Sequence, residues 1–221
     1  MQKNNAEMIK EMFEKQNELN IHTNGLNWRI DTNLKWYRAI WTECSELIDY
    51  TNWKWWRKQD ISLKDIEMEL IDIWHFLMSE LMTYYDITSC TENSLYKFTT
   101  YFETYQNFDM DRLQICTENL AKDTLNTRQA LLFNFVKLCS AIGPQMNIPG
   151  IYKLYMGKNV LNRFRQDNGY KQKTYQKIWN GKEDNFYLME YLGRIVEIGD
   201  DFEEEVYKEL DKQYKKFLIV K

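Results

Sequence analysis

The chain has 221 residues, of which 44% are hydrophobic and 15% aromatic, and its formal net charge is −4. This composition can build a hydrophobic core, and the lack of an overall positive charge argues against a general nucleic-acid binder, whose affinity comes largely from neutralising phosphates. The four cysteines are scattered without a C-x-x-C pair, which argues against a disulfide framework or a thiolate zinc site.

The N-terminal segment, MQKNNAEMIKEMF, lacks the apolar run of a signal peptide. No later stretch approaches the roughly 20 apolar residues that are needed to span a bilayer. We therefore expect a cytoplasmic protein that binds neither membrane nor nucleic acid.

The sequence predicts an all-α protein. It has only 8 glycines and 2 prolines, so few residues that break helices lie between its long periodic segments. Apolar periodicity predicts helices over residues 4–20, 36–51 and 63–85. The pair Asn24-Gly25 predicts a turn after the first helix, and the tryptophan-rich NWKWWRKQD closes the second. Residues 86–145 contain apolar helical patterns but no chemical motif that we can identify.

The last part of the chain begins with a break at GPQMNIPG. A helix is predicted over about residues 151–166, and Asn168-Gly169 is a suitable left-handed cap for its end. The segment YKQKTYQKIWNGKEDN is predicted to be a loop or a short helix, and residues 186–217 one or two helices.

Two pairs of carboxylates lie at i and i+3 on neighbouring predicted helices: Glu43 with Glu46, and Glu69 with Asp72. Residues at this spacing share a helix face. Asp72 lies in a segment that is apolar almost all round, and a buried carboxylate is normally paired or bound to a metal. Four converging carboxylates need a cation among them, and oxygen ligands suit Mg²⁺, with Mn²⁺ as the alternative.

Two other interpretations of these carboxylates remain open. Most such pairs on helices are solvated faces, so each pair taken alone favours that interpretation. A di-iron carboxylate bundle typically has E-x-x-H on two helices, and neither His22 nor His75 completes that motif.

One stretch of the chain is basic, from MGKNVLNRFRQDNGYK to NGKEDN. On a helix, Lys158, Asn162 and Arg165 fall at i, i+4 and i+7 and form one polar, cationic stripe. Arginine gives bidentate contacts to phosphate and lysine a mobile point charge. The alternative is a solvated basic face, and the chain has no P-loop motif.

Several blocks of the sequence closely resemble the dimeric all-α dUTPases, which belong to the all-α nucleoside triphosphate pyrophosphatases. These blocks are NGLNW, ECSELIDYTNWKWW, EMELIDIWHF and YMGKNVLNRFRQDNGYK with YQKIWNGKEDN, over roughly residues 8–85 and 150–186. The resemblance implies one all-α domain over residues 1–221, a multi-helix bundle that could have a rigid and a mobile lobe. It also implies a homodimer that hydrolyses dUTP, and usually dUDP, to dUMP with Mg²⁺.

The resemblance further implies roles for individual residues. Glu43, Glu46, Glu69 and Asp72 would bind Mg²⁺ ions, and Glu46 would also orient or deprotonate the attacking water. Gln16 and Asn20 would read the uracil edge, since an amide can donate and accept at once. Trp53 and His75 would line the uracil pocket, Asn162 would read the deoxyribose, and the phosphate ligands would be Lys158, Arg165, Tyr170, Lys171 and Lys182.

Two alternative functions remain. A related pyrophosphatase for another deoxynucleotide, such as dCTP, would share the carboxylates. Gln16 and Asn20 are the discriminating residues, because a flipped amide can read cytosine. A non-enzymatic helical interaction protein would bind no divalent metal and would not depend on Glu46.

Overall fold

The computed structural model of the chain describes residues 3–102 and 107–219. These residues form two compact units, the first ending at Tyr152 and the second beginning at Lys153. Helices account for most of the described residues, with one two-stranded sheet, so the predicted all-α class is confirmed. Among the described residues, none of the helices combines the length and the apolar character needed to cross a bilayer.

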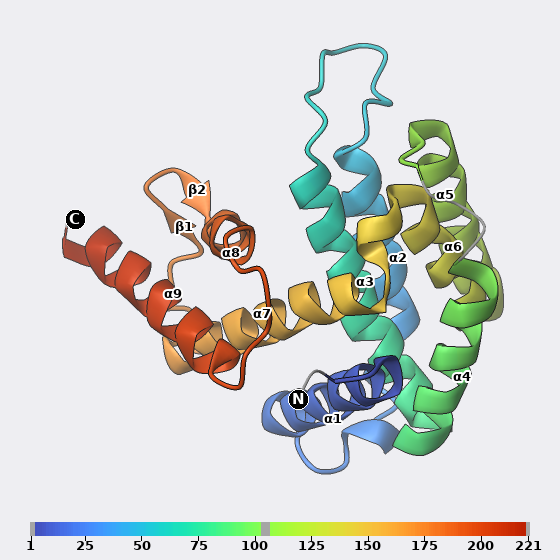
Figure 1. Cartoon of the computed structure of the whole chain (residues 1–221), viewed down its shortest axis with the longest axis horizontal. Helices are drawn as coiled ribbons and strands as arrows, with labels where there is room; N and C mark the ends of the chain where they lie inside the picture. The colour runs from blue at the N-terminus through green and yellow to red at the C-terminus, as the bar shows by residue number, and fades with distance from the viewer. Residues whose placement is uncertain (1–2, 103–106, 220–221) are drawn as a thin grey trace. The chain divides into compact units, whose positions relative to one another are not determined.

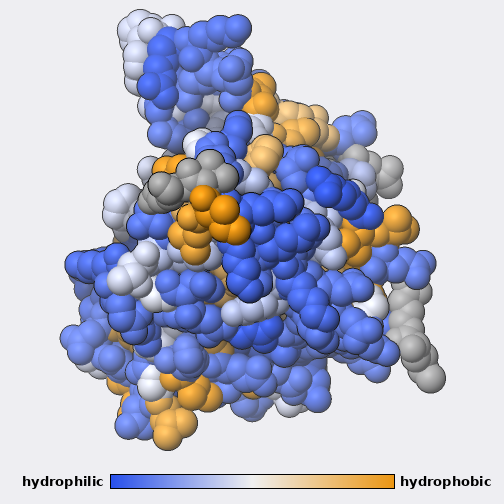
Figure 2. All heavy atoms as spheres, turned by 90° about the vertical axis from the view of Figure 1, so that its left-hand side faces the viewer, coloured by the Kyte–Doolittle hydropathy of each residue, from blue (hydrophilic) through white to orange (hydrophobic). Residues whose placement is uncertain are grey.

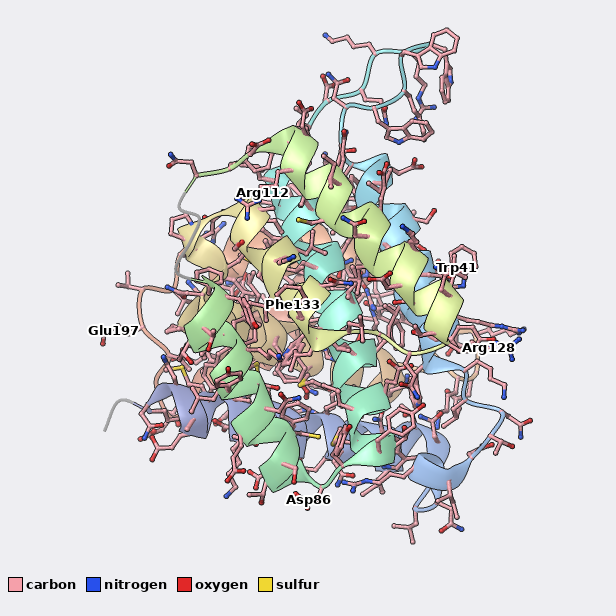
Figure 3. All side chains as sticks on the ribbon, turned by 90° about the vertical axis from the view of Figure 1, so that its right-hand side faces the viewer. Trp41, Asp86, Arg112, Arg128, Phe133 and Glu197 are labelled. Carbon is pink, nitrogen blue, oxygen red and sulfur yellow. The ribbon has the colours of Figure 1, made fainter. Side chains whose placement is uncertain are left out.

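The first unit is built from helices (Figure 1). Helix α2 packs against α3 and α5, α5 packs against α6, and α1 packs against α4. Figure 3 shows α4, α5 and α6 on one side of this unit, where Arg112 of α5 donates to Ser140 Oγ of α6 at 3.3 Å. The elements within the described residues of this unit are α1 (Asn5–Asn24), α2 (Trp36–Asp49), α3 (Leu63–Tyr84), α4 (Ile87–Tyr101), α5 (Met110–Thr127), α6 (Leu132–Ile142) and the 3-10 turns Trp28–Ile30 and Pro144–Met146.

The ends of α1 follow from its sequence. Asn4 Oδ1 accepts from the Glu7 backbone N–H at 3.0 Å, and Glu7 Oε2 accepts from the Asn4 N–H at 2.7 Å, which makes a capping box. The helix continues to Asn24 and stops at Gly25, whose φ is +88°. The predicted turn at Asn24-Gly25 is therefore confirmed.

Helix α3 is the central element of the first unit. Its Trp74 is fully buried, stacks on Phe135 of α6 with ring centroids 4.9 Å apart, and meets Phe13 of α1 edge-on at 5.8 Å. Ser62 caps its N-terminus by accepting from the Asp65 N–H. Burial of such large aromatic side chains dominates core energetics, so α3 holds α1 and α6 in place.

Helix α7 (Ile148–Asp167) begins in the first unit and continues into the second. The predicted break at GPQMNIPG contains the 3-10 turn and also the start of α7, because Pro149 lies in the first turn, where its missing N–H costs no hydrogen bond. The helix ends before Gly169, whose φ of +91° matches the predicted left-handed cap.

The second unit adds a hairpin and two helices: β1 (Ile178–Trp179), β2 (Lys182–Glu183), α8 (Asp184–Leu192) and α9 (Phe202–Ile219). The hairpin differs from the loop or short helix that we predicted for this segment. Asn180 and Gly181 both have positive φ, +48° and +79°, which is the pattern of a tight hairpin turn. Phe164, Trp179 and Tyr214 form the aromatic core of this unit.

The surface is mainly hydrophilic on the face drawn in Figure 2, where apolar residues gather in small separate patches. All four cysteines are free and buried. Burial raises the pKa of the Cys44 thiol to about 12, so this cysteine is a core side chain rather than a reactive thiolate.

Candidate active site

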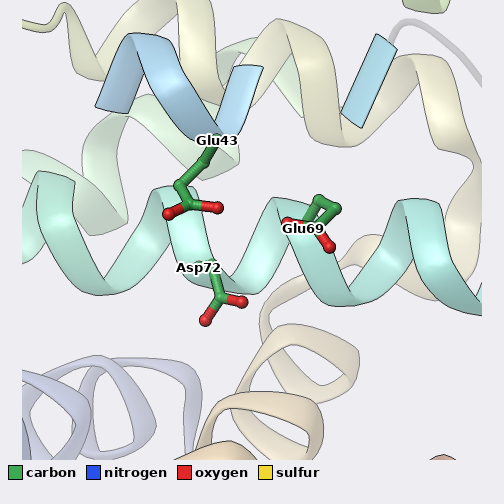
Figure 4. Close-up of side chains that lie close together, drawn as sticks. All are labelled: Glu43, Glu69 and Asp72. Atoms are coloured by element: carbon green, nitrogen blue, oxygen red, sulfur yellow. The ribbon is translucent and has the colours of Figure 1, made fainter. Parts of the chain in front are cut away.

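The packing of α2 against α3 brings three of the four predicted carboxylates together (Figure 4). Glu43, Glu69 and Asp72 each place one carboxylate oxygen within 4.8 Å of the other two. Glu69 is 7% exposed, while Glu43 and Asp72 are half-buried. Like charges this close repel in a partly dehydrated site, so the cluster favours a bound cation, and its all-oxygen donor set fits a hard divalent ion.

Asp72 and Glu46 differ from the sequence expectation. The apolar neighbours of Asp72 suggested a fully buried carboxylate, but Glu69 is the buried member of that pair. Glu46 lies one turn from Glu43 on α2, is exposed, and is outside the three-carboxylate cluster. Within the described residues Glu46 makes no hydrogen bond or ion pair, so its carboxylate is available to water.

The predicted base-reading amides lie between α1 and α3. Gln16 and Asn20 are each 3% exposed, and Gln16 Nε2 donates to Asn20 Oδ1 at 3.1 Å. Gln16 Oε1 lies 2.6 Å from His75 Nδ1, so the structure joins three of the four residues predicted for the uracil pocket. Ser79 accepts from both amides, at 3.0 Å from Gln16 Nε2 and 2.9 Å from Asn20 Nδ2.

Trp53, the fourth residue predicted for that pocket, lies elsewhere in the first unit. It belongs to the loop between α2 and α3, which extends from the end of the helix pair that is remote from α1 (Figures 1 and 3). Its ring is 41% exposed and lies edge-on to Trp56 at 5.2 Å, with Lys54 Nζ 5.5 Å from the ring centroid.

In the second unit, the predicted cationic stripe of α7 meets the start of α8. Arg165 Nη2 and Nε donate to the two carboxylate oxygens of Asp184 at 2.7 and 2.8 Å, and Arg165 Nη1 donates to Asn162 Oδ1 at 3.2 Å. Lys158 is 2% exposed and donates to Asn185 Oδ1 at 3.1 Å. The stripe is therefore a structured face and not the solvated surface of the alternative interpretation.

Asp184 is the buried anion of this group, with 0% exposure. Burial alone would raise the pKa of Asp184, but the Arg165 guanidinium and the Tyr175 hydroxyl, which donates at 2.8 Å, hold that pKa below its usual range. Burial and the neighbouring Asp184 charge raise the pKa of Tyr175, so its hydroxyl stays protonated and keeps donating.

The other predicted phosphate ligands are exposed. Tyr170 follows α7 with 51% exposure, and Lys171 is also at the surface. Lys182 on β2 has its Nζ 5.1 Å from the Phe186 ring centroid. The carboxylates and amides belong to the first unit, and all five predicted phosphate ligands belong to the second.

A comparison with protein families establishes the class. The family model described as dUTPase matches residues 8–170, which include the carboxylates, the amides and all of α7. The chain belongs to the dUTPase family. The protein is therefore an enzyme of the dUTP diphosphatase class, as the resemblance implied.

The matched range of this dUTPase differs from the range over which we noted the resemblance. It runs through residues 86–145, which we could not assign, and ends before the YQKIWNGKEDN block. No curated protein matches the chain significantly.

Sequence reasoning missed two positions of this dUTPase. Ser79 follows His75 at i+4, and this spacing places both on one face of α3, which is the signal that could have indicated it. Asp184 was noticed only as part of the WNGKEDN block, because its partner Arg165 lies 19 residues earlier and sequence spacing does not reveal that pairing.

Proposed function

We propose that this dUTPase hydrolyses dUTP to dUMP and pyrophosphate with Mg²⁺, accepts Mn²⁺ in its place, and also hydrolyses dUDP. The observation that supports this proposal best is the convergence of Glu43, Glu69 and Asp72 on α2 and α3, within the region that the dUTPase family model matches.

Glu43, Glu69 and Asp72 would hold the divalent ion, with Glu46 as a further ligand from the next turn of α2. The donor set is made only of oxygens and carries a high negative charge, which is the preference of Mg²⁺ and Mn²⁺. A bound divalent ion would supply polarisation of the phosphoryl oxygens and compensation of the charge on the leaving group.

Glu46 is our candidate general base. It is exposed and its carboxylate is not engaged by other described side chains, so it can accept a proton from a water molecule beside the cluster. The proton would pass from the attacking water to a Glu46 oxygen.

Gln16 and Asn20 would read the uracil edge, with His75 fixing the Gln16 carbonyl through its Nδ1 at 2.6 Å. A His75 ring that donates to this carbonyl carries its proton on Nδ1. Trp53, on its exposed loop, would add an aromatic surface for the nucleotide.

Asn162 would bind the deoxyribose, and the phosphates would be bound by Lys158, Arg165, Tyr170, Lys171 and Lys182. The supporting observation is that Lys158, Asn162 and Arg165 lie along one face of α7, and Arg165 donates to Asn162. We further propose a homodimer in the cytoplasm, as the resemblance and the sequence imply.

The test is a product analysis of dUTP and dUDP with Mg²⁺, with Mn²⁺ and with a chelator in excess. We expect dUMP and pyrophosphate from dUTP, dUMP and orthophosphate from dUDP, and no turnover with the chelator. Release of orthophosphate from dUTP, or undiminished turnover in the chelator, would overturn the proposal. Sedimentation velocity tests the dimer separately.

A further inference from the structure

Ser79 is the centre of the hydrogen-bond network around the two amides. It is fully buried, and its hydroxyl donates to the His75 backbone carbonyl one turn earlier at 2.8 Å. Its oxygen accepts from Gln16 Nε2 at 3.0 Å and from Asn20 Nδ2 at 2.9 Å. A hydroxyl has one hydrogen to donate and two lone pairs that accept, so the Ser79 hydroxyl uses all of its hydrogen-bonding capacity.

Because of these hydrogen bonds, the observed orientation of each amide has a lower free energy than the orientation in which its oxygen and nitrogen are exchanged. A flip of Asn20 would bring its carbonyl oxygen to 2.9 Å from Ser79 Oγ, and a flip of Gln16 would do the same at 3.0 Å. Ser79 could satisfy such an oxygen only by withdrawing its single hydrogen from the His75 carbonyl. A buried acceptor without a donor carries a desolvation penalty, so the hydroxyl disfavours both flips.

Asn20 keeps hydrogen-bonding capacity for a ligand. Among the described residues its Nδ2 donates only to Ser79 and its Oδ1 accepts only from Gln16, which leaves one amide hydrogen and one lone pair. Along its pairing edge, uracil presents an acceptor at O4 beside a donor at N3. Cytosine presents the reverse order, a donor at N4 beside an acceptor at N3, and an amide must flip to match it.

We propose that Ser79 is a specificity-determining positioning residue, whose hydroxyl fixes the orientation of Gln16 and Asn20 so that the site accepts uracil and rejects cytosine. The proposal rests on the proposed role of these two amides in base recognition. Ser79 does not itself contact the base; it acts by selecting which amide atoms face it.

The experiment compares kcat/KM for dUTP and dCTP in the wild type and in Ser79→Ala. Loss of a polar group that enforces base discrimination should lower the dUTP-to-dCTP ratio by about 10-fold or more. A merely structural role would reduce activity on both substrates alike and leave the ratio unchanged. The matched control is Ser94→Ala on α4, because Ser94 is also fully buried and its hydroxyl has no hydrogen-bond partner within the described structure.

A second variant, Ser79→Cys, keeps the proposal testable if Ser79→Ala does not fold. Ser79→Cys keeps the size of the side chain but provides a weak acceptor, so we expect a smaller fall in the same ratio. A wild type without preference for dUTP over dCTP would overturn the base assignment together with this proposal. A wild type that prefers dUTP, with the preference intact in both Ser79 variants, would overturn the role of Ser79 alone.

Discussion

Asp184 binds the guanidinium of Arg165 through both of its carboxylate oxygens, at 2.7 and 2.8 Å, in a position where Asp184 is fully buried. A single buried carboxylate thus positions a cation that we propose to bind phosphate. The next residue, Asn185, accepts from Lys158 at 3.1 Å, so the start of α8 holds two cations of α7. The orientation of these cations is therefore set within the second unit, before any nucleotide binds.

Replacing Asp184 should destabilise the second unit. Asp184→Asn leaves Arg165 without its counter-charge, and breaking a buried ion pair from one side costs about 3–5 kcal/mol. Urea denaturation followed by circular dichroism measures this change. The control is Glu204→Gln, which removes the exposed ion pair with Lys208 and should change stability little, because solvent screens an exposed pair. Equal effects of the two substitutions would contradict the structural role of Asp184.

Loss of the buried carboxylate of the cluster should weaken metal binding. Glu69→Gln removes one negative charge from a group of three whose oxygens lie within 4.8 Å. We expect at least a roughly 10-fold weaker affinity for Mn²⁺ by isothermal titration calorimetry, and a fold that is no less stable without metal, because repulsion is relieved. Glu118→Gln, at an exposed position of α5, should leave affinity unchanged. Wild-type affinity in Glu69→Gln would remove this residue from the metal site.

Replacing the candidate base Glu46 should remove most of the turnover but preserve the fold. Glu46→Gln keeps the size of an exposed side chain that makes no described hydrogen bond, so unfolding should be unaffected. Loss of a general base typically lowers kcat by about 10²–10⁴-fold. Unchanged kcat with dUTP would exclude Glu46 as the residue that activates water.

Glu80 should make stability depend on pH. Burial raises the pKa of this α3 carboxyl from 4.5 to about 7, although the Ala130 N–H donates to it at 2.6 Å. The folded state therefore holds a proton that the unfolded state releases at lower pH. The resulting stability is fully present below the unfolded pKa and is lost as pH rises through about 7.

Glu80→Gln tests this dependence, because glutamine keeps an oxygen for the Ala130 N–H and does not titrate. Relative to the wild type, the variant should gain up to about 3 kcal/mol between pH of about 5 and about 8. Lys97, Tyr84 and Tyr85 line the same surface pocket as Glu80. A difference between the two proteins that does not vary with pH would show that Glu80 is ionised in the folded state.

The fold was predictable where apolar periodicity is strong. Helices α1, α2, α3 and α7 begin and end close to the predicted residues, because their apolar stripes are long. Asn, Ser or Gly also marks at least one end of α1, α3 and α7. Helix α4 was not predicted from the sequence. Its buried face consists of Cys90, Thr91, Ser94 and Phe98, a mostly small and polar set that weakens the apolar periodicity. The hairpin strands have two residues each, which is too short for alternation to register.

The site was predictable as far as single helices determine it. The i, i+3 spacing identified Glu43, Glu69 and Asp72, and the structure brings these three together. Which side chain of α1 meets which side chain of α3 depends on tertiary packing, so the link from Gln16 to Ser79 could not be derived. The prediction that Asp72 is fully buried was wrong for the same reason. The apolar neighbours of Asp72 do not reveal which face of α3 is covered by α2.

The most direct test of metal-dependent, uracil-specific hydrolysis is pyrophosphate release from dUTP, dCTP, dTTP and UTP, measured at equal concentrations with and without Mg²⁺. We predict release from dUTP in preference to the other three nucleotides, and only with the metal. Equal rates with dUTP and dCTP would contradict the assignment of uracil recognition to Gln16 and Asn20, and release without any divalent metal would contradict the role of Glu43, Glu69 and Asp72.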